Sequence, residues 1–482
     1  MRTPYPFLLI LFYCIGTVNA QDIEAAINVN LKSNEAPIVY PYNGGSQLVF
    51  FSDDELRYFR LNNNFQIESS GSFDLGELGF KPNIYELNAN RKNIHLFYSR
   101  RDSSGLRCFS INTINKKAKK SICLPSWNQN TLLLGHAAYN DTAFFFSSNT
   151  EGTITYSTVA DGELLHEMTL EVSSAAFTAW KKAAMAYPQL CKTQILEEDF
   201  VQMGKIPFAP IKFFTSSRYI YASIEGSFTT HIITVNKVIK QMTHFSYPIR
   251  LPDNGSLRGS LSNSYVSKGF LFQAVSTQTG IVMQKTHLKS HDASYSKFFT
   301  YHNCVKAGAP VYIHNRGKHG TFARKPDNVF EYHGDKRNRF LALFVSTRGS
   351  FDHILVSEVE PLYGFEEWAS RNTLVPSKEH SQKTKGIVKS YGLEVQPTLH
   401  FSLLKHISFK SSTIGLSLSG SGVLENFAGP EDFPIAEANV LFYKMKYSSL
   451  FPSHSSLCYF NNTLYYCFYR KTKKQYYFAA LK

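Results

Sequence analysis

The sequence predicts an all-β protein, because one hairpin pattern recurs along the chain, recurs at a regular interval, and is completed by the two chain ends. In each copy an apolar run ends near a serine, a polar tip with one glycine follows, and a second alternating run leads away. The five best copies occupy residues 96–111, 144–159, 220–235, 271–288 and 342–359. Alternating apolar strands separated so often by turn residues are typical of β-structure.

The spacing of the hairpins indicates how the strands are grouped. Two looser copies without glycine, 48–61 and 464–481, extend the series, and successive hairpins begin 46, 48 or 50 residues apart where the spacing is regular. That interval is about the length of one four-stranded propeller blade. The chain therefore resembles the β-propeller fold in general. We expect a single β-propeller of seven four-stranded blades, with six or eight blades as alternatives.

The chain ends predict that the ring closes. The last hairpin stops at Leu481, which leaves no room for a fourth strand, while a spare alternating segment lies at residues 22–31. If this N-terminal strand completes the last blade, no sheet edge stays open to pair with another molecule.

Residues 1–20 have the pattern of a secretory signal peptide. Arg2 supplies a positive start, residues 7–15 an apolar core, and Val18-Asn19-Ala20 a small-residue end before Gln21. The apolar core is too short to span a bilayer, although an uncleaved anchor is the alternative. No later segment reaches 18 apolar residues, so we expect no transmembrane segment. The predicted product is residues 21–482, one domain that is secreted and either extracellular or periplasmic.

Three insertions interrupt the spacing. Residues 173–203 are alanine-rich and predict a short helix, 301–337 predict mostly loop, and 360–400 begin with a helical pattern and continue with charged residues. Residues 400–423 predict either an eighth blade or the outer strands of the sixth. In a blade, the connection after the fourth strand emerges on the same face as the tip between strands two and three. The first two insertions should therefore rise on that face, which we call the tip face.

The basic charge favours anionic partners. The chain has 51 Lys and Arg against 37 Asp and Glu, a formal net charge of +14. No arginine-rich groove with stacking aromatic residues accompanies it, so no nucleic acid is expected. The second insertion holds a candidate ligand site because arginine suits carboxylate, sulfate or phosphate groups. Its candidate residues are Arg316, Lys318, His319, Arg324 and Lys325. A solvated loop is the alternative.

No metal or cofactor is predicted. The same insertion contains His302, His314, His319 and His333, but they form no HxH, HxxxH or HExxH pattern. No carboxylate stands at ligand spacing beside them.

The cysteines suggest disulfides. Six remain after residue 20, an even number in an oxidising compartment. Folding the chain at 115–116 places Cys108 opposite Cys123, and a turn at 462–463 places Cys458 opposite Cys467, in both cases within disulfide reach. Cys191 and Cys304 form the remaining pair. Buried free thiols are the alternative. The motifs at Asn140, Asn254 and Asn461 are N-glycosylation acceptors if the source is eukaryotic.

Acidic and aromatic residues at the strand ends are compatible with an enzyme that acts on carbohydrates. Paired carboxylates suit glycoside hydrolysis, but Asp and Glu are also ordinary turn residues. The acidic tip residues are Asp53, Asp54, Asp102, Glu151, Glu225 and Asp352. Aromatic strand ends either ring a sugar-binding funnel or, more often, pack between blades. They are Tyr42, Tyr85, Tyr139, Tyr332 and Tyr459.

The leading hypothesis is a non-enzymatic binding or adhesion module whose tip face binds a protein or an anionic glycan. A secreted carbohydrate-active enzyme with carboxylates in the central pocket is the first alternative. A structural subunit of an envelope or cell-surface complex is the second. Fold membership alone decides none of these, and the sequence leaves enzymatic activity and the oligomeric state open.

Overall fold

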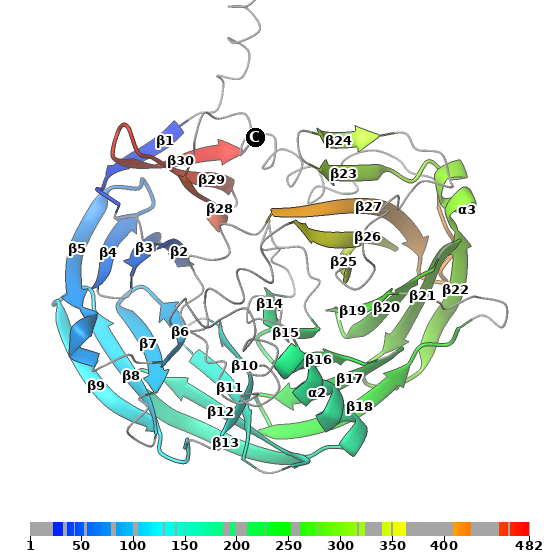
Figure 1. The fold of residues 1–482 in the computed structure, drawn as a ribbon, viewed down its shortest axis with the longest axis horizontal. Coiled ribbons are helices and arrows are strands. Elements are labelled where there is room, and N and C mark those ends of the chain that lie inside the picture. Colours follow the sequence, from blue (N-terminus) through cyan, green and yellow to red (C-terminus); the bar gives the residue numbers. More distant parts are fainter. Residues whose placement is uncertain are drawn as a thin grey trace, which may run out of the picture.

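In the computed structural model, the described residues form seven β-sheets arranged in chain order around a common centre (Figure 1). The chain is a β-propeller, as predicted. The structure describes residues 23–481 except for the following positions: 32–35, 43, 53–54, 79–82, 100–104, 129–130, 140–141, 150, 187–192, 198–209, 227, 252–260, 278, 316–317, 323–339, 349, 363–407, 426–452 and 461–462. Among these described residues, no helix is both long and apolar enough to cross a membrane.

Four sheets are four-stranded antiparallel meanders in which neighbouring strands follow one another in the chain. The first sheet comprises β2 (Ala36–Tyr42), β3 (Gly45–Phe51), β4 (Glu55–Asn62) and β5 (Ile67–Asp74), followed by the 3-10 helix η2 (Leu75–Leu78). The second comprises β6 (Asn83–Ala89), β7 (Asn93–Ser99), β8 (Leu106–Asn112) and β9 (Lys117–Leu124). The third comprises β10 (Leu132–Tyr139), β11 (Thr142–Ser148), β12 (Thr153–Ala160) and β13 (Glu163–Glu171). The fifth comprises β19 (Leu261–Ser267), β20 (Phe270–Ser276), β21 (Gly280–His287) and β22 (Ala293–Thr300).

The fourth and sixth sheets contain strands from the insertions. In the fourth, β14 (Thr193–Glu197) adds a parallel strand to the meander β15 (Ile211–Thr215), β16 (Tyr219–Glu225), β17 (Thr229–Asn236) and β18 (Gln241–Pro248). In the sixth, the order is β24 (Lys318–Phe322), β23 (Val311–Asn315), β27 (Ser408–Ser419), β26 (Phe351–Leu362) and β25 (Phe340–Arg348). Residues 408–419 therefore belong to the sixth sheet, which settles that segment in favour of outer strands.

The seventh sheet closes the ring as the chain ends predicted. Its strands are β28 (Ser453–Phe460), β29 (Thr463–Arg470), β30 (Gln475–Leu481) and β1 (Ile23–Asn28), and β1 pairs with β30. Ile27 lies opposite Tyr476, and both side chains are buried in the core between this sheet and the first. The N-terminal strand thus completes the last blade.

The glycines at the hairpin tips have local physical causes. Gly152, in the tip between β11 and β12, has a φ of +80°, which side chains other than glycine rarely adopt. Gly280 begins β21 against β22, and a Cβ there would lie 2.2 Å from the Phe299 carbonyl oxygen. The recurring glycine therefore has two different causes: a positive φ in one hairpin and a close backbone contact in another.

Both described insertions rise on the tip face. The helix α2 (Ser174–Ala186) confirms the predicted helix in 173–203, and the Ser173 hydroxyl caps it by accepting from the Ala176 amide at 3.3 Å. The 301–337 insertion is more regular than expected, since it contains α3 (Tyr301–Lys306) and the β23–β24 hairpin. Tyr301 anchors α3 by donating from its hydroxyl to the Thr277 carbonyl at the β20–β21 tip, at 3.0 Å.

The predicted Cys108–Cys123 disulfide is wrong, because both cysteines are free, buried thiols. The β8–β9 turn pairs Asn112 with Lys117, which places Ser121 opposite Cys108. Cys123 falls in a bulge and donates its thiol to the Leu106 carbonyl at 3.2 Å. Burial raises the pKa of the Cys108 thiol to about 12.

The other two predicted disulfides are Cys458–Cys467 and Cys191–Cys304. The β28–β29 turn pairs Phe460 with Thr463, so Tyr465 rather than Cys467 lies opposite Cys458. The register that suggested a Cys458–Cys467 bridge is therefore wrong by two residues. Cys304 is a free, buried thiol in α3, and its expected partner Cys191 lies outside the described residues.

Candidate functional site

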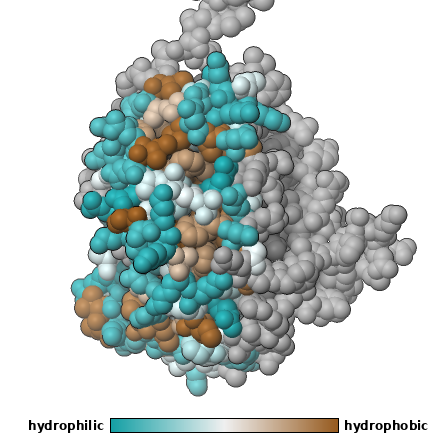
Figure 2. Space-filling view, turned by 90° about the vertical axis from the view of Figure 1, so that its left-hand side faces the viewer, coloured by the Kyte–Doolittle hydropathy of each residue, from teal (hydrophilic) through white to brown (hydrophobic). Residues whose placement is uncertain are grey.

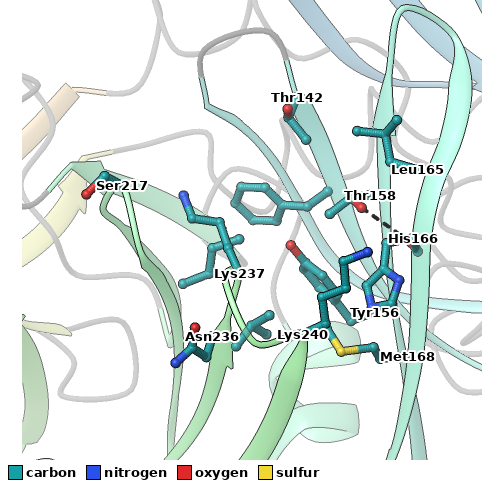
Figure 3. A pocket seen from close by; sticks show the side chains of 13 residues that line it. Thr142, Tyr156, Thr158, Leu165, His166, Met168, Ser217, Asn236, Lys237 and Lys240 are labelled. Carbon is teal, nitrogen blue, oxygen red and sulfur yellow. Dashed lines mark hydrogen bonds between the residues drawn. The ribbon is translucent and has the colours of Figure 1, made fainter.

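A pocket of about 610 Å³ lies between the third and fourth sheets (Figure 3). Its volume falls within the range of small-molecule sites, about 300–1,000 Å³. The lining residues come from strands β11 to β13, from β16 and β17, and from two turns of the fourth sheet. They are Thr142, Phe144, Tyr156, Thr158, Leu165, His166, Met168, Ser217, Ile220, Val235, Asn236, Lys237 and Lys240.

The pocket lies toward the face opposite the tips, which we call the turn face because the β12–β13 and β17–β18 turns emerge there. Thr142 begins β11, Leu165 and His166 lie near the start of β13, and Lys237 and Lys240 lie in the β17–β18 turn. This location differs from the face on which the sequence predicted ligand binding. The tip face carries the insertions, but the described pocket is at the other end of the strands.

Aromatic packing closes the inter-sheet space on the tip side. Phe146 of the third sheet stacks on Phe213 of the fourth with ring centroids 5.0 Å apart, and Trp180 of α2 packs on Phe146 at 5.7 Å. Trp180 is fully buried and donates its indole N–H to the Leu134 carbonyl at 3.0 Å. The helical insertion therefore plugs the space between the two sheets at one end, and the pocket occupies the other.

The inner wall of the pocket is mainly apolar, and two buried polar atoms on its lining residues, the Tyr156 hydroxyl and His166 Nε2, have no hydrogen-bond partner among the described residues. Phe144, Ile220 and Val235 are buried hydrophobic residues, and Met168 packs against the same core. Tyr156 lies among them with 1% of its surface exposed, and Figure 3 shows its hydroxyl directed into the pocket. Among the described residues this hydroxyl has no hydrogen-bond partner. Burial raises the pKa of Tyr156, so its phenol stays protonated and can donate a hydrogen bond.

The mouth of the pocket is cationic. Lys240 is exposed at the end of the β17–β18 turn, and Lys237 is half-buried and donates to the Ser216 carbonyl. Burial lowers the pKa of Lys237 below that of a solvated lysine. Asn236 shapes this turn because its side-chain oxygen accepts from the amides of Val238 and Ile239 at 3.0 and 3.3 Å. Among the described lining residues there is no Asp or Glu, so the pocket favours negative charge.

These features suit a ligand with two kinds of surface. An apolar wall with one buried hydroxyl and lysines at the mouth accommodates a ligand that has an apolar part and an anionic group. Glycoside hydrolysis by the usual route needs two carboxyl groups facing the scissile bond. The residues that line this pocket do not supply them.

The predicted basic ligand site stays a prediction. Lys318 and His319 begin β24, where His319 pairs with His314 in the backbone register. Arg316, Arg324 and Lys325 lie outside the described residues, as does His333. His302 is exposed in α3, and no cluster that could hold a metal ion occurs among the described residues.

The acidic tip residues that the structure describes do not meet at one site. Glu225 pairs with the fully buried Lys212 at 2.8 Å, and Asp352 pairs with the buried Lys285 at 2.7 Å. Each of these carboxylates is thus neutralised by a lysine, and Glu151 is exposed. Asp53, Asp54 and Asp102 lie outside the described residues.

Most other candidate residues lie outside the described part of the chain. This applies to Asn140, Asn254 and Asn461, to residues 1–20, and to the side chains of the aromatic strand ends other than Tyr42. Tyr42 donates its hydroxyl to the Leu61 carbonyl at 3.1 Å within its own sheet. That contact supports a packing role for Tyr42.

The similarity of this chain to known proteins is limited to the fold. No protein-family model and no curated protein matches the chain. The β-propeller domain of Nup133 from Vanderwaltozyma polyspora is similar at 11% identity and a TM-score of 0.28, covering 56% of this chain and 76% of that one. An α-L-arabinofuranosidase from Clostridium thermocellum is similar at 10% identity and 0.24, covering 55% and 94%. The SapL1 lectin, solved with α-methyl fucoside, is similar at 8% identity and 0.25, covering 69% and 94%.

Proposed function

We propose that the protein is a non-enzymatic binding module that holds an anionic ligand with an apolar part in the pocket between the third and fourth sheets. We expect this activity outside the cytosol, in keeping with the signal peptide that the sequence predicts. The observation that carries the proposal is the Tyr156 hydroxyl, which is directed into an apolar pocket without a hydrogen-bond partner among the described residues. The ligand is anionic, as the charge of the chain suggested, but the proposed site is on the turn face and not on the tip face.

The unpartnered hydroxyl supports a ligand because burying such a group has a cost. A buried hydroxyl without a partner destabilises a protein by about 1–3 kcal/mol. Ten buried side-chain polar atoms among the described residues have no partner, and only those of Tyr156 and His166 belong to residues that line the pocket. Phenylalanine would fill the same space without that cost. A ligand acceptor that reaches Tyr156 while its anionic group meets Lys240 satisfies the hydroxyl and pairs with an exposed cation at once.

A fluorescence titration with 8-anilinonaphthalene-1-sulfonate tests the proposal, since this probe joins an apolar ring system to a sulfonate. We expect saturable binding by the folded chain 21–482 and about tenfold weaker binding by Lys240→Met, because a charge-assisted contact is lost. Lys289→Met is the matched control. Lys289 is also exposed in a third–fourth strand turn, in the neighbouring sheet, but it does not line the pocket. Equal affinities in the two variants would contradict the proposed site.

Tyr156→Phe separates a binding role from a packing role. Without ligand, we expect this variant to be more stable than the parent by about 1 kcal/mol, because an unsatisfied buried hydroxyl is removed and the ring is kept. With ligand, we expect the stabilisation by saturating 8-anilinonaphthalene-1-sulfonate to be smaller than in the parent. Thermal unfolding with and without the probe measures both. A variant that is less stable without ligand would show that the hydroxyl is a structural hydrogen-bonding group.

A further inference from the structure

Two histidines of the fourth sheet lie in its contact with the third sheet, which we call the seam. His231 of β17 lies opposite Ser246 of β18, and its Nδ1 atom is 2.9 Å from the Ser246 hydroxyl oxygen. His244 of β18 lies opposite Ile233, on the same face of the sheet, and Ile233 belongs to the core shared with the third sheet. The rings of His231 and His244 stack with their centroids 5.8 Å apart. The fourth sheet thus directs a pair of imidazoles toward the third.

Neither imidazole is placed to hold a charge. His231 is 6% exposed, and the Nε2 atom of His244 is buried without a hydrogen-bond partner among the described residues. Burial lowers the pKa of both side chains, and the closeness of His231 lowers the pKa of His244 further. On the outer side of the ring, by contrast, hydrophilic residues surround small separate groups of apolar ones, so charges there reach water (Figure 2). A proton on either seam histidine lacks such solvation.

The charged groups of the fourth sheet do not balance a proton on either histidine. Glu225 of β16 lies near His231 and opposes the effect of burial on the pKa of that histidine. Its carboxylate, however, is already paired with the fully buried Lys212 at 2.8 Å. Lys237 and Lys240 belong to the β17–β18 turn, line the pocket in the same seam and add positive charge. Protonation of the histidines therefore adds to an existing excess of positive charge.

The third sheet and helix α2 do not supply a counter-charge either. The outer strand β13 packs against β18 and contributes a further imidazole, His166, to the seam. The three glutamates of β13 stand at alternate positions that point away from the seam, and Glu163 accordingly lies 3.9 Å from Lys119 of the second sheet. Helix α2 contains two lysines and no acid, and β12 contributes the neutral phenol of Tyr156.

We infer that the seam is an acid-sensitive junction, which stays closed while His231 and His244 are neutral and loosens when they take up protons. The third and fourth sheets are separate sheets, so their contact can loosen while the hydrogen bonds within each sheet remain. Once solvated, each imidazole regains its ordinary pKa of about 6.5. The loosened state therefore binds more protons, and the seam loses stability as the pH falls below that value. The inference does not depend on a ligand, because neither histidine lines the pocket.

Trp180 reports on the seam, because it is fully buried there and packs on Phe146 of the third sheet. In the chain 21–482 with Trp127→Phe and Trp368→Phe, it is the one tryptophan left. We expect acrylamide to quench its fluorescence more strongly at about pH 5.5 than at about pH 7.5, on either side of the ordinary histidine pKa, while the far-ultraviolet circular dichroism stays unchanged. Quenching that rises only together with loss of the circular dichroism signal overturns the inference, because acid then unfolds the whole ring.

Histidine variants identify the groups that take up the protons. Urea unfolding between about pH 5.5 and 7.5 gives the unfolding equilibrium constant, which each buried neutral histidine makes rise by up to about tenfold per pH unit of acidification. The double variant His231→Gln, His244→Phe should therefore lose up to about 100-fold of this pH dependence per unit. Each variant is compared with itself across pH, so a loss of stability that does not depend on pH has no influence. An unchanged pH dependence in the double variant overturns the inference.

His353→Gln is the matched control. His353 is 7% exposed, and its Nδ1 atom is 3.0 Å from the hydroxyl oxygen of Ser417 on the next strand, but it lies in the sixth sheet. The control should leave the pH at which Trp180 becomes accessible to acrylamide unchanged, whereas His244→Phe should lower it. A control that moves this pH as far as His244→Phe overturns the inference, because acid then acts on the ring as a whole and not on the seam.

Discussion

A chain that begins at residue 32, and therefore lacks β1, is expected to lose the cooperative unfolding transition of the chain that begins at Gln21. Without β1, the backbone of β30 becomes an open edge, and the aromatic side chains of Tyr476 and Phe478 lose part of their cover. An exposed apolar edge strand pairs readily with other molecules. Thermal unfolding followed by circular dichroism, together with size-exclusion chromatography, should show a broad transition and soluble aggregates.

Two isoleucines of β1 provide a matched point test. Ile27 is 3% exposed and Ile23 is 46% exposed, although both lie in the same six-residue strand. We expect Ile27→Ala to lower the free energy of unfolding by about 2–5 kcal/mol and Ile23→Ala to change it by less than about 0.5 kcal/mol. Urea unfolding measures both values. Equal effects would mean that β1 does not contribute its buried face to the closure of the ring.

Removing the Glu225 carboxylate is expected to be the most destabilising point change among the charged residues of the fourth sheet. Lys212 is fully buried and contacts the Glu225 carboxylate at 2.8 Å and the Asn263 side-chain oxygen at 2.7 Å. Burial lowers the pKa of Lys212, and the neighbouring Glu225 carboxylate opposes that effect. Glu225→Ala leaves a buried ammonium without its counter-charge, which costs about 3–5 kcal/mol. Urea unfolding at neutral pH measures the loss.

Two further variants identify the cause of that loss. Glu151→Ala removes an exposed acid beside the tip of the third sheet and should change the free energy of unfolding by less than about 0.5 kcal/mol. Adding Lys212→Met to Glu225→Ala should restore much of the stability, because no buried charge then remains. If the double variant is no more stable than Glu225→Ala alone, packing rather than an uncompensated charge explains the effect.

Much of the ring could be predicted from the sequence, because the signals are local. The apolar runs and their glycine-containing tips identified the five best hairpins, which the structure contains as β7–β8, β11–β12, β16–β17, β20–β21 and β25–β26. The missing strand after Leu481 and the spare strand before residue 32 identified the closure. The sheet to which β23 belongs could not be predicted. Its partner β27 lies about a hundred residues later, and a short alternating run does not show which strand it pairs with.

The disulfide errors have one physical origin. Each depended on the centre of a turn, and each turn lies one residue earlier than the sequence suggested, at 112–117 and 460–463. A shift of one residue in the centre of a hairpin moves every cross-strand partner by two. Turn residues such as Asn and Lys tolerate several turn lengths, so a correct hairpin does not fix the register at the accuracy that a disulfide requires.

The pocket could not be predicted because its residues are dispersed. Tyr156 and Phe144 belong to alternating strands in which buried aromatic residues are ordinary, and only the contact between two sheets turns them into one wall. A weak signal was present in the segment from Asn236 to Lys240, where two exposed aliphatic residues stand between two lysines in a turn. Turns of a purely structural kind rarely expose such residues.

The pairing of β1 with β30 also determines when the protein can finish folding. The Asn28 side-chain oxygen accepts from the Gln475 side-chain nitrogen at 2.8 Å, across 447 residues of sequence. At ordinary rates of synthesis, about 5–20 residues per second, the first strand waits roughly 20–90 seconds before its partner exists. Closure is therefore necessarily a late event, and a contact between residues so distant in the chain also forms slowly. Because β1 is made long before β30, the newly made chain must keep β1 from pairing with other molecules until β30 has been made.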